Sequence, residues 1–241
     1  RHADEAFDRS ERNYEYAYFH TSGTSELALP AGAATVEVIR GLEFKPVKRE
    51  VRVAAGATRA LRVVLERLAD MPAKGWYSAD LHVHMNYGGA YLNTPRRLAF
   101  QAAAEDLHVV ENLVVNKEQR IPDIAYFSGK PSPPWTSGAL VVHGQEFHTS
   151  FWGHTALVGI EESFLLPDYA GYASTAAASL FPNNPAVFDL ARAQGGITGY
   201  VHPFDKDPDP ENVDERLTHD LPVGAALGKL DGFNLFDPYW M

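Results

Sequence analysis

The sequence predicts an α/β fold in which a small β-sandwich module precedes a larger domain built on a parallel sheet. Residues 14–68 are short segments of alternating polarity separated by glycine and proline, a pattern typical of antiparallel strands. From residue 76 to residue 241, strand-like segments alternate with helical ones, which is typical of a parallel sheet covered by helices. Between the two, ADMPAKG (69–75) is the predicted linker, and residues 1–13 form a charged lead-in.

The composition narrows the functions open to the chain. It has 241 residues, 45% of them hydrophobic, a net charge of -10 and no cysteine. The acidity argues against nucleic acid or an anionic membrane as partner, because both need a basic surface. The absence of cysteine excludes disulfides, thiolate metal ligands and a cysteine nucleophile. No apolar run approaches the length of a membrane span and no signal peptide is present, so we expect no membrane segment. The compartment stays open, with a preference for the periplasm or secretion.

The module at residues 14–68 contains five candidate strands: YEYAYFH, SELALP, ATVEVIRG, VKREVRVAAG and TRALRVVLERL. In the third of these, Val36 and Val38 fall on one face, and Glu37 and Ile39 fall on the other. No group of catalytic residue types occurs here, so we expect the module to serve as a spacer or packing unit.

The domain at residues 76–241 contains two clear helices. One is TPRRLAFQAAAEDL, with Thr94 as N-cap and Pro95 at the first helical position. The other is NPAVFDLARAQGG, opened by Asn184 and Pro185 and closed by two glycines. The predicted strands after the first one, which ends in DLHVH, are HVVENLVV, GALVVHGQEFHTS, HTALVGI, ITGYVHP and LDGFNLF.

Histidine and glutamate collect near the ends of these predicted strands. Seven of the ten histidines lie between His82 and His202. Residues i and i+2 of a strand share a face, as in the pairs of DLHVH and GQEFH. The ends of parallel barrel strands meet at one mouth, where imidazole and carboxylate can bind zinc, manganese or iron. The predicted metal ligands are His82, His84, Glu146, His154 and His202.

The remaining histidines receive other roles. His148 shares the face of Glu146 and is expected either to bind the metal or to contact the metal ligands or the substrate. His143 has the opposite alternation to Glu146, and His108 begins a strand instead of ending one, so both are predicted to be structural. Surface positions are expected for His2, His20 and His219.

Taken together and in this order, DLHVH, GQEFH with GHTALVG, and GGITGYVHP followed by LDGF resemble the polymerase-and-histidinol-phosphatase (PHP) domain. More narrowly they resemble its carbaryl-hydrolase-like branch, and the module before them resembles the small β-sandwiches attached to secreted bacterial hydrolases. The resemblance implies a distorted, TIM-like (β/α)7 barrel with two or three metal ions, where a bridging hydroxide attacks a phosphate ester or another ester or amide-like bond. By position, His82 and His84 match the first motif, Glu146 the bridging carboxylate, and His154 and His202 the later ligands.

Two departures from the family pattern affect the expected site. Val114 and Val115, followed by Asn116 and Lys117, stand where the family has an Asp-His pair. No Asp-x-His follows His202, so either the chain is truncated or the barrel is a shortened one. We therefore expect an incomplete barrel that holds one or two metal ions.

Two functions follow as hypotheses. The first is a metal-dependent hydrolase, phosphoesterase-like, with His148 and His202 moving protons for a small-molecule or glycan-like substrate. The second is a non-catalytic protein that binds a glycan or a partner on a degenerate barrel. No serine-hydrolase elbow, P-loop or dinucleotide motif is present. The oligomeric state is not predicted. The predicted substrate-binding residues are Asn86, Tyr87, Asn116, Lys117 and Trp152.

Overall fold

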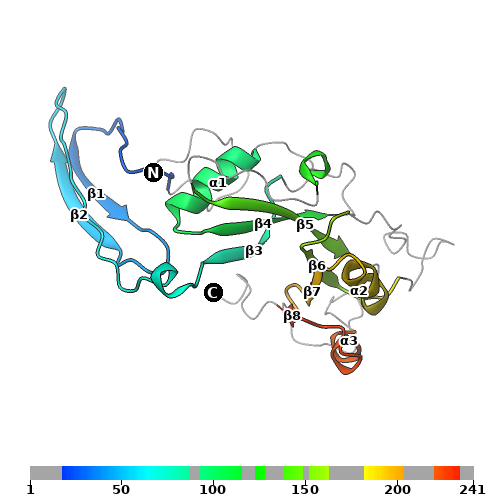
Figure 1. The fold of residues 1–241 in the computed structure, drawn as a ribbon. Coiled ribbons are helices and arrows are strands. Elements are labelled where there is room, and N and C mark those ends of the chain that lie inside the picture. Colours follow the sequence, from blue (N-terminus) through cyan, green and yellow to red (C-terminus); the bar gives the residue numbers. More distant parts are fainter. Residues whose placement is uncertain are drawn as a thin grey trace, which may run out of the picture. The chain divides into compact units, whose positions relative to one another are not determined.

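The structure is a computed structural model of the 241-residue chain. It describes residues 18–86, 93–115, 123–128, 138–148, 152–162, 182–203 and 220–233 (Figure 1).

The larger sheet of the structure is a mixed sheet and not the (β/α)7 barrel that was predicted. Its strand order is β3-β4-β5-β6-β7-β8 (Figure 1). Strand β6 runs antiparallel to both β5 and β7, while β7 and β8 are parallel. The six strands are β3 (Ala79–Val83), β4 (Val109–Val115), β5 (Leu140–His148), β6 (His154–Val158), β7 (Ile197–Tyr200) and β8 (Gly232–Phe233).

The prediction failed on the direction of the strands. Only five residues, 149–153, connect β5 to β6. A parallel crossover needs about a dozen residues or more, so a connection this short joins antiparallel strands. The strand positions were nearly right because apolar runs mark strands, but an apolar run carries no information on direction.

The described ranges hold three α-helices: α1 (Pro95–Ala104), α2 (Asn184–Arg192) and α3 (Leu221–Ala226). Single 3-10 turns add η1 (Pro72–Lys74) and η3 (Ile124–Tyr126). Helix α1 begins at Pro95 as predicted, whereas the N-cap of α2 is Asn183, one residue earlier than expected, and its side chain accepts from the Ala186 amide. In these ranges no helix combines the length and the apolar character that crossing a membrane requires.

One hydrophobic core lies between α2 and the strands β5 to β7. Phe188 of α2 meets Tyr200 of β7 edge to face, with 5.2 Å between ring centroids. Phe147 and Leu157 come from neighbouring strands, β5 and β6, and are fully buried in the same cluster. Because Phe147 and Glu146 are adjacent in β5, their side chains point to opposite faces. The core therefore lies on the face of β5 opposite to the side chain of Glu146.

The N-terminal region holds a two-stranded antiparallel sheet. Strand β1 (Gly32–Val38) pairs with β2 (Val47–Val53). Among residues 18–78 no further strand is described, and one isolated bridge joins Phe44 to Arg67. The predicted β-sandwich is therefore not found there: SELALP and TRALRVVLERL do not form strands, and most of YEYAYFH lies outside the described residues.

The chain divides into two compact units. The first is Arg1–Asp80 with Arg96–Val110 and Pro134–Leu140. The second is Leu81–Pro95 with Glu111–Pro133 and Val141–Met241. The predicted domain limits, 14–68 and 76–241, stay a prediction.

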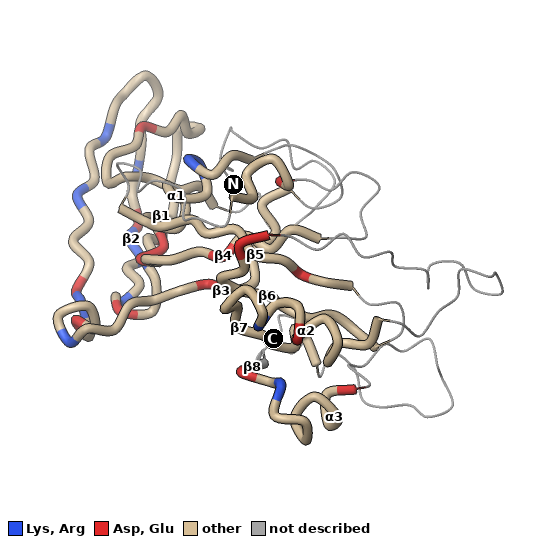
Figure 2. Tube along the Cα trace, turned by 45° about the vertical axis from the view of Figure 1, so that its right-hand side comes forward, with Lys and Arg blue, Asp and Glu red and all other residues tan. Residues whose placement is uncertain are grey.

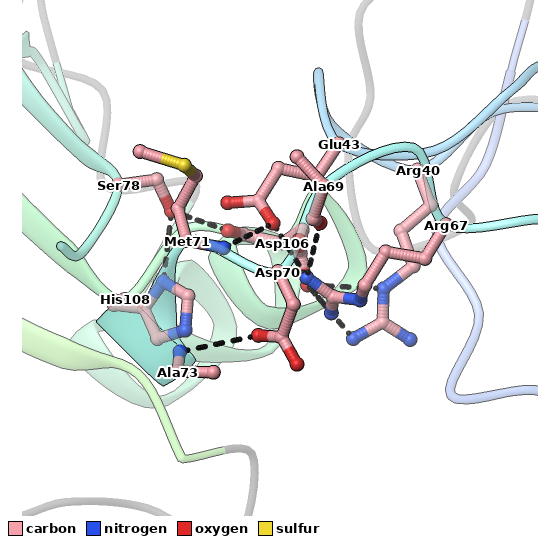
Figure 3. A network of polar contacts seen from close by, with 10 residues as sticks. All are labelled: Arg40, Glu43, Arg67, Ala69, Asp70, Met71, Ala73, Ser78, Asp106 and His108. Atoms are coloured by element: carbon pink, nitrogen blue, oxygen red, sulfur yellow. Dashed lines mark hydrogen bonds and ion pairs between the residues drawn. The ribbon is translucent and has the colours of Figure 1, made fainter. Parts of the chain in front are cut away.

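Within the first unit, two arginines converge on the turn that follows α1 (Figure 3). Arg40 donates to Asp106 Oδ1 from Nε at 3.2 Å and from Nη2 at 3.1 Å. Arg67 lies 3.6 Å from the same oxygen and donates to Glu43 at 2.6 Å. His108 bonds Ser78 Oγ at 2.8 Å, which agrees with the structural role expected for it.

Basic residues gather in β2 and the segment after it, where Figure 2 marks them in blue. Residues 36–67 carry eight lysines and arginines against four acidic residues. The net negative charge of the chain therefore comes from the residues outside this stretch.

Candidate metal centre

The site is built around one buried carboxylate, that of Glu146 on β5. Its side chain is 2% exposed. Oxygen Oε2 lies 2.5 Å from His84 Nε2 and 3.3 Å from His82 Nε2. His82 lies in β3 and His84 is the first residue after it. Both reach the same oxygen because positions i and i+2 of a strand share a face.

Three further histidines surround the second oxygen of this carboxylate. Glu146 Oε1 lies 3.0 Å from His154 Nδ1, 3.2 Å from His148 Nε2 and 3.3 Å from His202 Nε2. His154 Nδ1 and His202 Nε2 are themselves 3.1 Å apart. Five imidazoles thus converge on a single carboxylate, and all six residues belong to the second unit.

The antiparallel hairpin of β5 and β6 explains how the last residue of one strand meets the first residue of the next. His148 and His154 stand opposite each other in the register. Their rings stack with centroids 3.5 Å apart and 4° between the ring planes. In a parallel arrangement these two positions would lie at opposite ends of the sheet, so the hairpin is what completes the cluster.

His202 follows β7 with a backbone φ of 33°, in the left-handed region that non-glycine residues seldom adopt. Such a conformation costs about 1–3 kcal/mol and occurs most often at functional sites. Here it accompanies a side chain that reaches both His154 and Glu146. The backbone strain is therefore tied to the position of this ring.

One hydrogen bond fixes which nitrogen of His84 faces the cluster. His84 Nδ1 lies 2.9 Å from the carbonyl oxygen of Leu113 on β4. A carbonyl can only accept, so Nδ1 carries the hydrogen and Nε2 is turned toward Glu146. This is how metal-binding histidines are commonly oriented by a second partner.

The electrostatics keep the carboxylate ionised. Burial opposes ionisation of Glu146, but hydrogen bonds from the surrounding histidines outweigh it and hold the pKa of Glu146 well below its usual range. Burial also disfavours the charged form of His84, yet the bond to Glu146 and its charge raise the pKa of His84 above the ordinary value. Burial lowers the pKa of His154 to about 4, so this ring is neutral at pH 7 and keeps a lone pair.

The donor set fits a divalent cation. His82, Glu146 and His202 offer ligand atoms within 4.8 Å of one another, and so do Glu146, His148 and His154. Imidazole nitrogen and carboxylate oxygen are the ligands of zinc, manganese and iron sites. A neutral imidazole such as that of His154 keeps the lone pair that a metal ion needs, and the ionised carboxylate of Glu146 supplies a negative charge beside it.

The sequence-predicted residues fall into three groups. All five predicted ligands meet at the cluster, and His148 joins them. Asn86 is buried and bonded to Asn93 and Asp123, so its amide is engaged within the protein. The carbonyl of Trp152 accepts from Asn184 Nδ2 at 3.1 Å. Tyr87, Asn116 and Lys117 lie outside the described residues.

Val114 and Val115, which the sequence comparison set against the Asp-His pair of the PHP pattern, are buried in β4, each 2% exposed. Sequence reasoning missed the neighbouring polar pair Glu111 and Asn112, which are also buried. The signal was present, because two polar residues interrupt the apolar strand HVVENLVV. Buried polar residues at such places need partners, so they point to a network.

No family profile matches the chain, and no curated protein matches it. Among solved structures it is similar to a two-domain protein from Bacteroides vulgatus ATCC 8482, described as containing a predicted PHP-like metal-dependent phosphoesterase. The identity is 17% and the TM-score 0.39, over 65% of this chain and 43% of that one. The match thus spans less than half of that protein, and the metal centre rests on the contacts given above.

Proposed function

We propose that the second unit is a metal-dependent hydrolase that cleaves a phosphate ester or another ester or amide-like bond. The observation that carries this proposal is the convergence of five imidazoles on the buried carboxylate of Glu146. The motifs that resemble a PHP domain favour a phosphate ester among these bonds. A bound divalent cation would supply a water with a pKa near 7 and polarise the scissile group.

The side chains of the metal centre differ in how far they are exposed to solvent. Glu146 and His148 are buried, at 2% and 7%, whereas the His202 side chain is 22% exposed. His82, His84 and His154 are open to a similar degree as His202. Substrate therefore approaches from the side of these four rings. Of the two histidines predicted to move protons, His202 is open to this side and His148 is enclosed.

The number of ions follows from the two ligand groups. Both contain Glu146, and each adds two histidines. A carboxylate with two oxygens can bridge two ions, so the site suits one or two. The apolar pair Val114 and Val115 gives no ligand for a third.

Metal analysis and an ester panel test the proposal together. The chain is purified without chelators, its content of zinc, manganese and iron is measured, and turnover of phosphate monoesters, phosphate diesters and carboxylic esters is followed. We expect one or two ions per chain and turnover that Glu146→Gln abolishes. Metal without turnover of any ester would instead favour the non-catalytic binding protein, and a chain that binds no divalent metal would overturn both the site and the reaction.

A further inference from the structure

A second buried network of polar side chains lies within the same unit and does not include the five histidines around Glu146. Asp123 and Asn86 are 3% exposed, and Asn112 is fully buried. On β5 the network includes His143, which precedes Glu146 by three residues, so the two side chains point to opposite faces of the strand. On β5 the network therefore lies on the face opposite to the metal centre.

Asp123 is the hub of this network. Its Oδ1 accepts from Asn86 Nδ2 at 2.6 Å, and its Oδ2 accepts from Asn112 Nδ2 at 3.1 Å. The backbone of Asp123 has a φ of 67°, a left-handed conformation that is uncommon outside glycine. Each carboxylate oxygen thus receives one amide from a different part of the chain.

The orientation of both amides is fixed by backbone groups that can only donate. The Met85 amide donates to Asn112 Oδ1 at 2.8 Å, and the Asn93 amide donates to Asn86 Oδ1 at 2.7 Å. Both NH2 groups must therefore face Asp123. The second hydrogen of Asn112 Nδ2 points to His143 Nδ1, 3.2 Å away, so that nitrogen acts as the acceptor.

The network reaches the metal centre through His84. Met85, held by Asn112, is the residue after His84, and Leu113, whose carbonyl orients the His84 ring, is the residue after Asn112. Asn112 thus holds the backbone next to His84 through Met85, and it lies next to Leu113, the residue on β4 that orients the His84 ring. A shift of Asn112 would move the Nε2 atom that lies 2.5 Å from Glu146.

We infer that Asp123 and Asn112 form a positioning pair, which holds His84 Nε2 in place for metal binding. The inference rests on the proposed metal centre. Neither residue touches the cluster, so their effect has to pass through the backbone and ring of His84. Residues that orient metal ligands typically contribute 10–100-fold in affinity.

The decisive variant is Asp123→Asn, which keeps the shape and replaces one oxygen with NH2. The new NH2 group at position 123 then faces the NH2 group of Asn86 or Asn112. Turning Asn112 would break its bond to the Met85 amide, and turning Asn86 would break its bond to the Asn93 amide. We expect the affinity for Co²⁺, titrated into the metal-free protein, to fall about 10–100-fold. We also expect the visible absorption of the cobalt protein to change, because it reports the coordination geometry.

The exchange Asp123→Asn with Asn112→Asp tests the pairing itself. In this double variant the carboxylate at position 112 still accepts from Met85 and now also from the new amide at position 123, and His143 can turn its Nδ1 into a donor. Cobalt affinity and spectrum should return to within about threefold of the unmodified protein. If the single variant does not fold, the exchange alone decides: a folded exchange with tenfold weaker cobalt binding overturns the inference.

Asp106→Asn is the matched control, because Asp106 is also a buried aspartate in a left-handed turn but contacts Arg40 in the first unit. It should lower stability and leave the cobalt spectrum unchanged. If Asp123→Asn folds and binds cobalt with unchanged affinity and spectrum, the positioning role is wrong. If the unmodified protein binds no cobalt, the metal centre itself fails, which is a separate outcome.

Discussion

At the scale of single residues, Glu146 joins three strands through their side chains. His82 on β3 with His84 just after it, His148 on β5 and His154 on β6 all reach its two oxygens. The ligand set was predictable because alternation within a strand depends on sequence spacing alone. Asp123 was not, because it lies in no strand or helix and its partners are 37 and 11 residues away.

Glu146→Gln tests the central carboxylate. The amide removes the negative charge and one acceptor but keeps the shape, so the five imidazoles lose their common anionic partner. We expect metal affinity to fall by more than about 100-fold, beyond the 10–100-fold typical of outer partners. Isothermal titration with Zn²⁺ measures this, and the exposed Glu161→Gln should bind as the unmodified protein does. Zinc binding within tenfold of that of the unmodified protein would show that Glu146 is not a ligand.

Glu111 gives a pH dependence of stability that can be assigned to one residue. Burial raises the pKa of this carboxyl to about 7, against a smaller opposing effect of the hydrogen bond with the Gly159 backbone. Its Oε1 has no hydrogen-bond partner among the described residues. Between the ordinary value of 4.5 and 7, the folded state keeps a proton that the unfolded state has lost. The contribution of Glu111 to stability therefore falls as the pH rises through this window, and the loss is complete above 7.

Glu111→Gln cannot ionise and should escape this loss. Relative to the unmodified protein, we expect its free energy of unfolding to gain on the order of 3 kcal/mol between pH 4.5 and pH 8, at 1.36 kcal/mol per pKa unit. Urea unfolding of both metal-free proteins at the two pH values measures the difference. A difference that does not change with pH would contradict a raised pKa for Glu111.

At the scale of elements, the sequence predicted where strands lie better than how they run. Strands β4 to β7 begin and end within two residues of the predicted segments, except that β7 stops three residues earlier, because apolar runs bounded by turn residues are local signals. Direction depends on the length of each connection, and the five residues between β5 and β6 already exclude a parallel pair. The alternation in SELALP and TRALRVVLERL did not suffice to make strands, because strand pairing depends on partners far away in the chain.

The residues that follow β1 contact the end of α1 closely, and a glycine substitution there tests how tight this contact is. Gly41 has a φ of 50°, and a Cβ there would lie 2.6 Å from the Glu105 carbonyl oxygen. Gly56 has a φ of 70° with nothing within 4 Å of such a Cβ. Gly41→Ala should lower the free energy of unfolding by about 2–4 kcal/mol, from backbone strain and overpacking together. Gly56→Ala should cost about 1–2 kcal/mol, from the backbone alone. Equal losses in urea unfolding would mean that the Gly41 contact contributes nothing.

At the scale of the whole molecule, the two units differ in what a metal can stabilise. All six residues of the cluster belong to the second unit, and β1 and β2 belong to the first. A ligand that binds only the folded state stabilises it by about 2.7 kcal/mol at 100 times its dissociation constant. An isolated two-stranded sheet is at best marginally stable, so its amides exchange with solvent through local opening instead of global unfolding.

Added metal should therefore slow amide hydrogen exchange in the second unit and leave it unchanged in the β1–β2 sheet. With Zn²⁺ in excess, the amides of β5, β6 and β7 should exchange more slowly, because their slowest exchange requires opening of the strands that hold the ligands. The amides of β1 and β2 should exchange at the same rate with and without the ion. Mass spectrometry of peptic peptides resolves the two groups, and Glu146→Gln should remove the gain in β5 to β7. An equal gain in β1 and β2 would show that the hairpin opens only together with the metal-binding unit, and that the whole chain unfolds as one cooperative body.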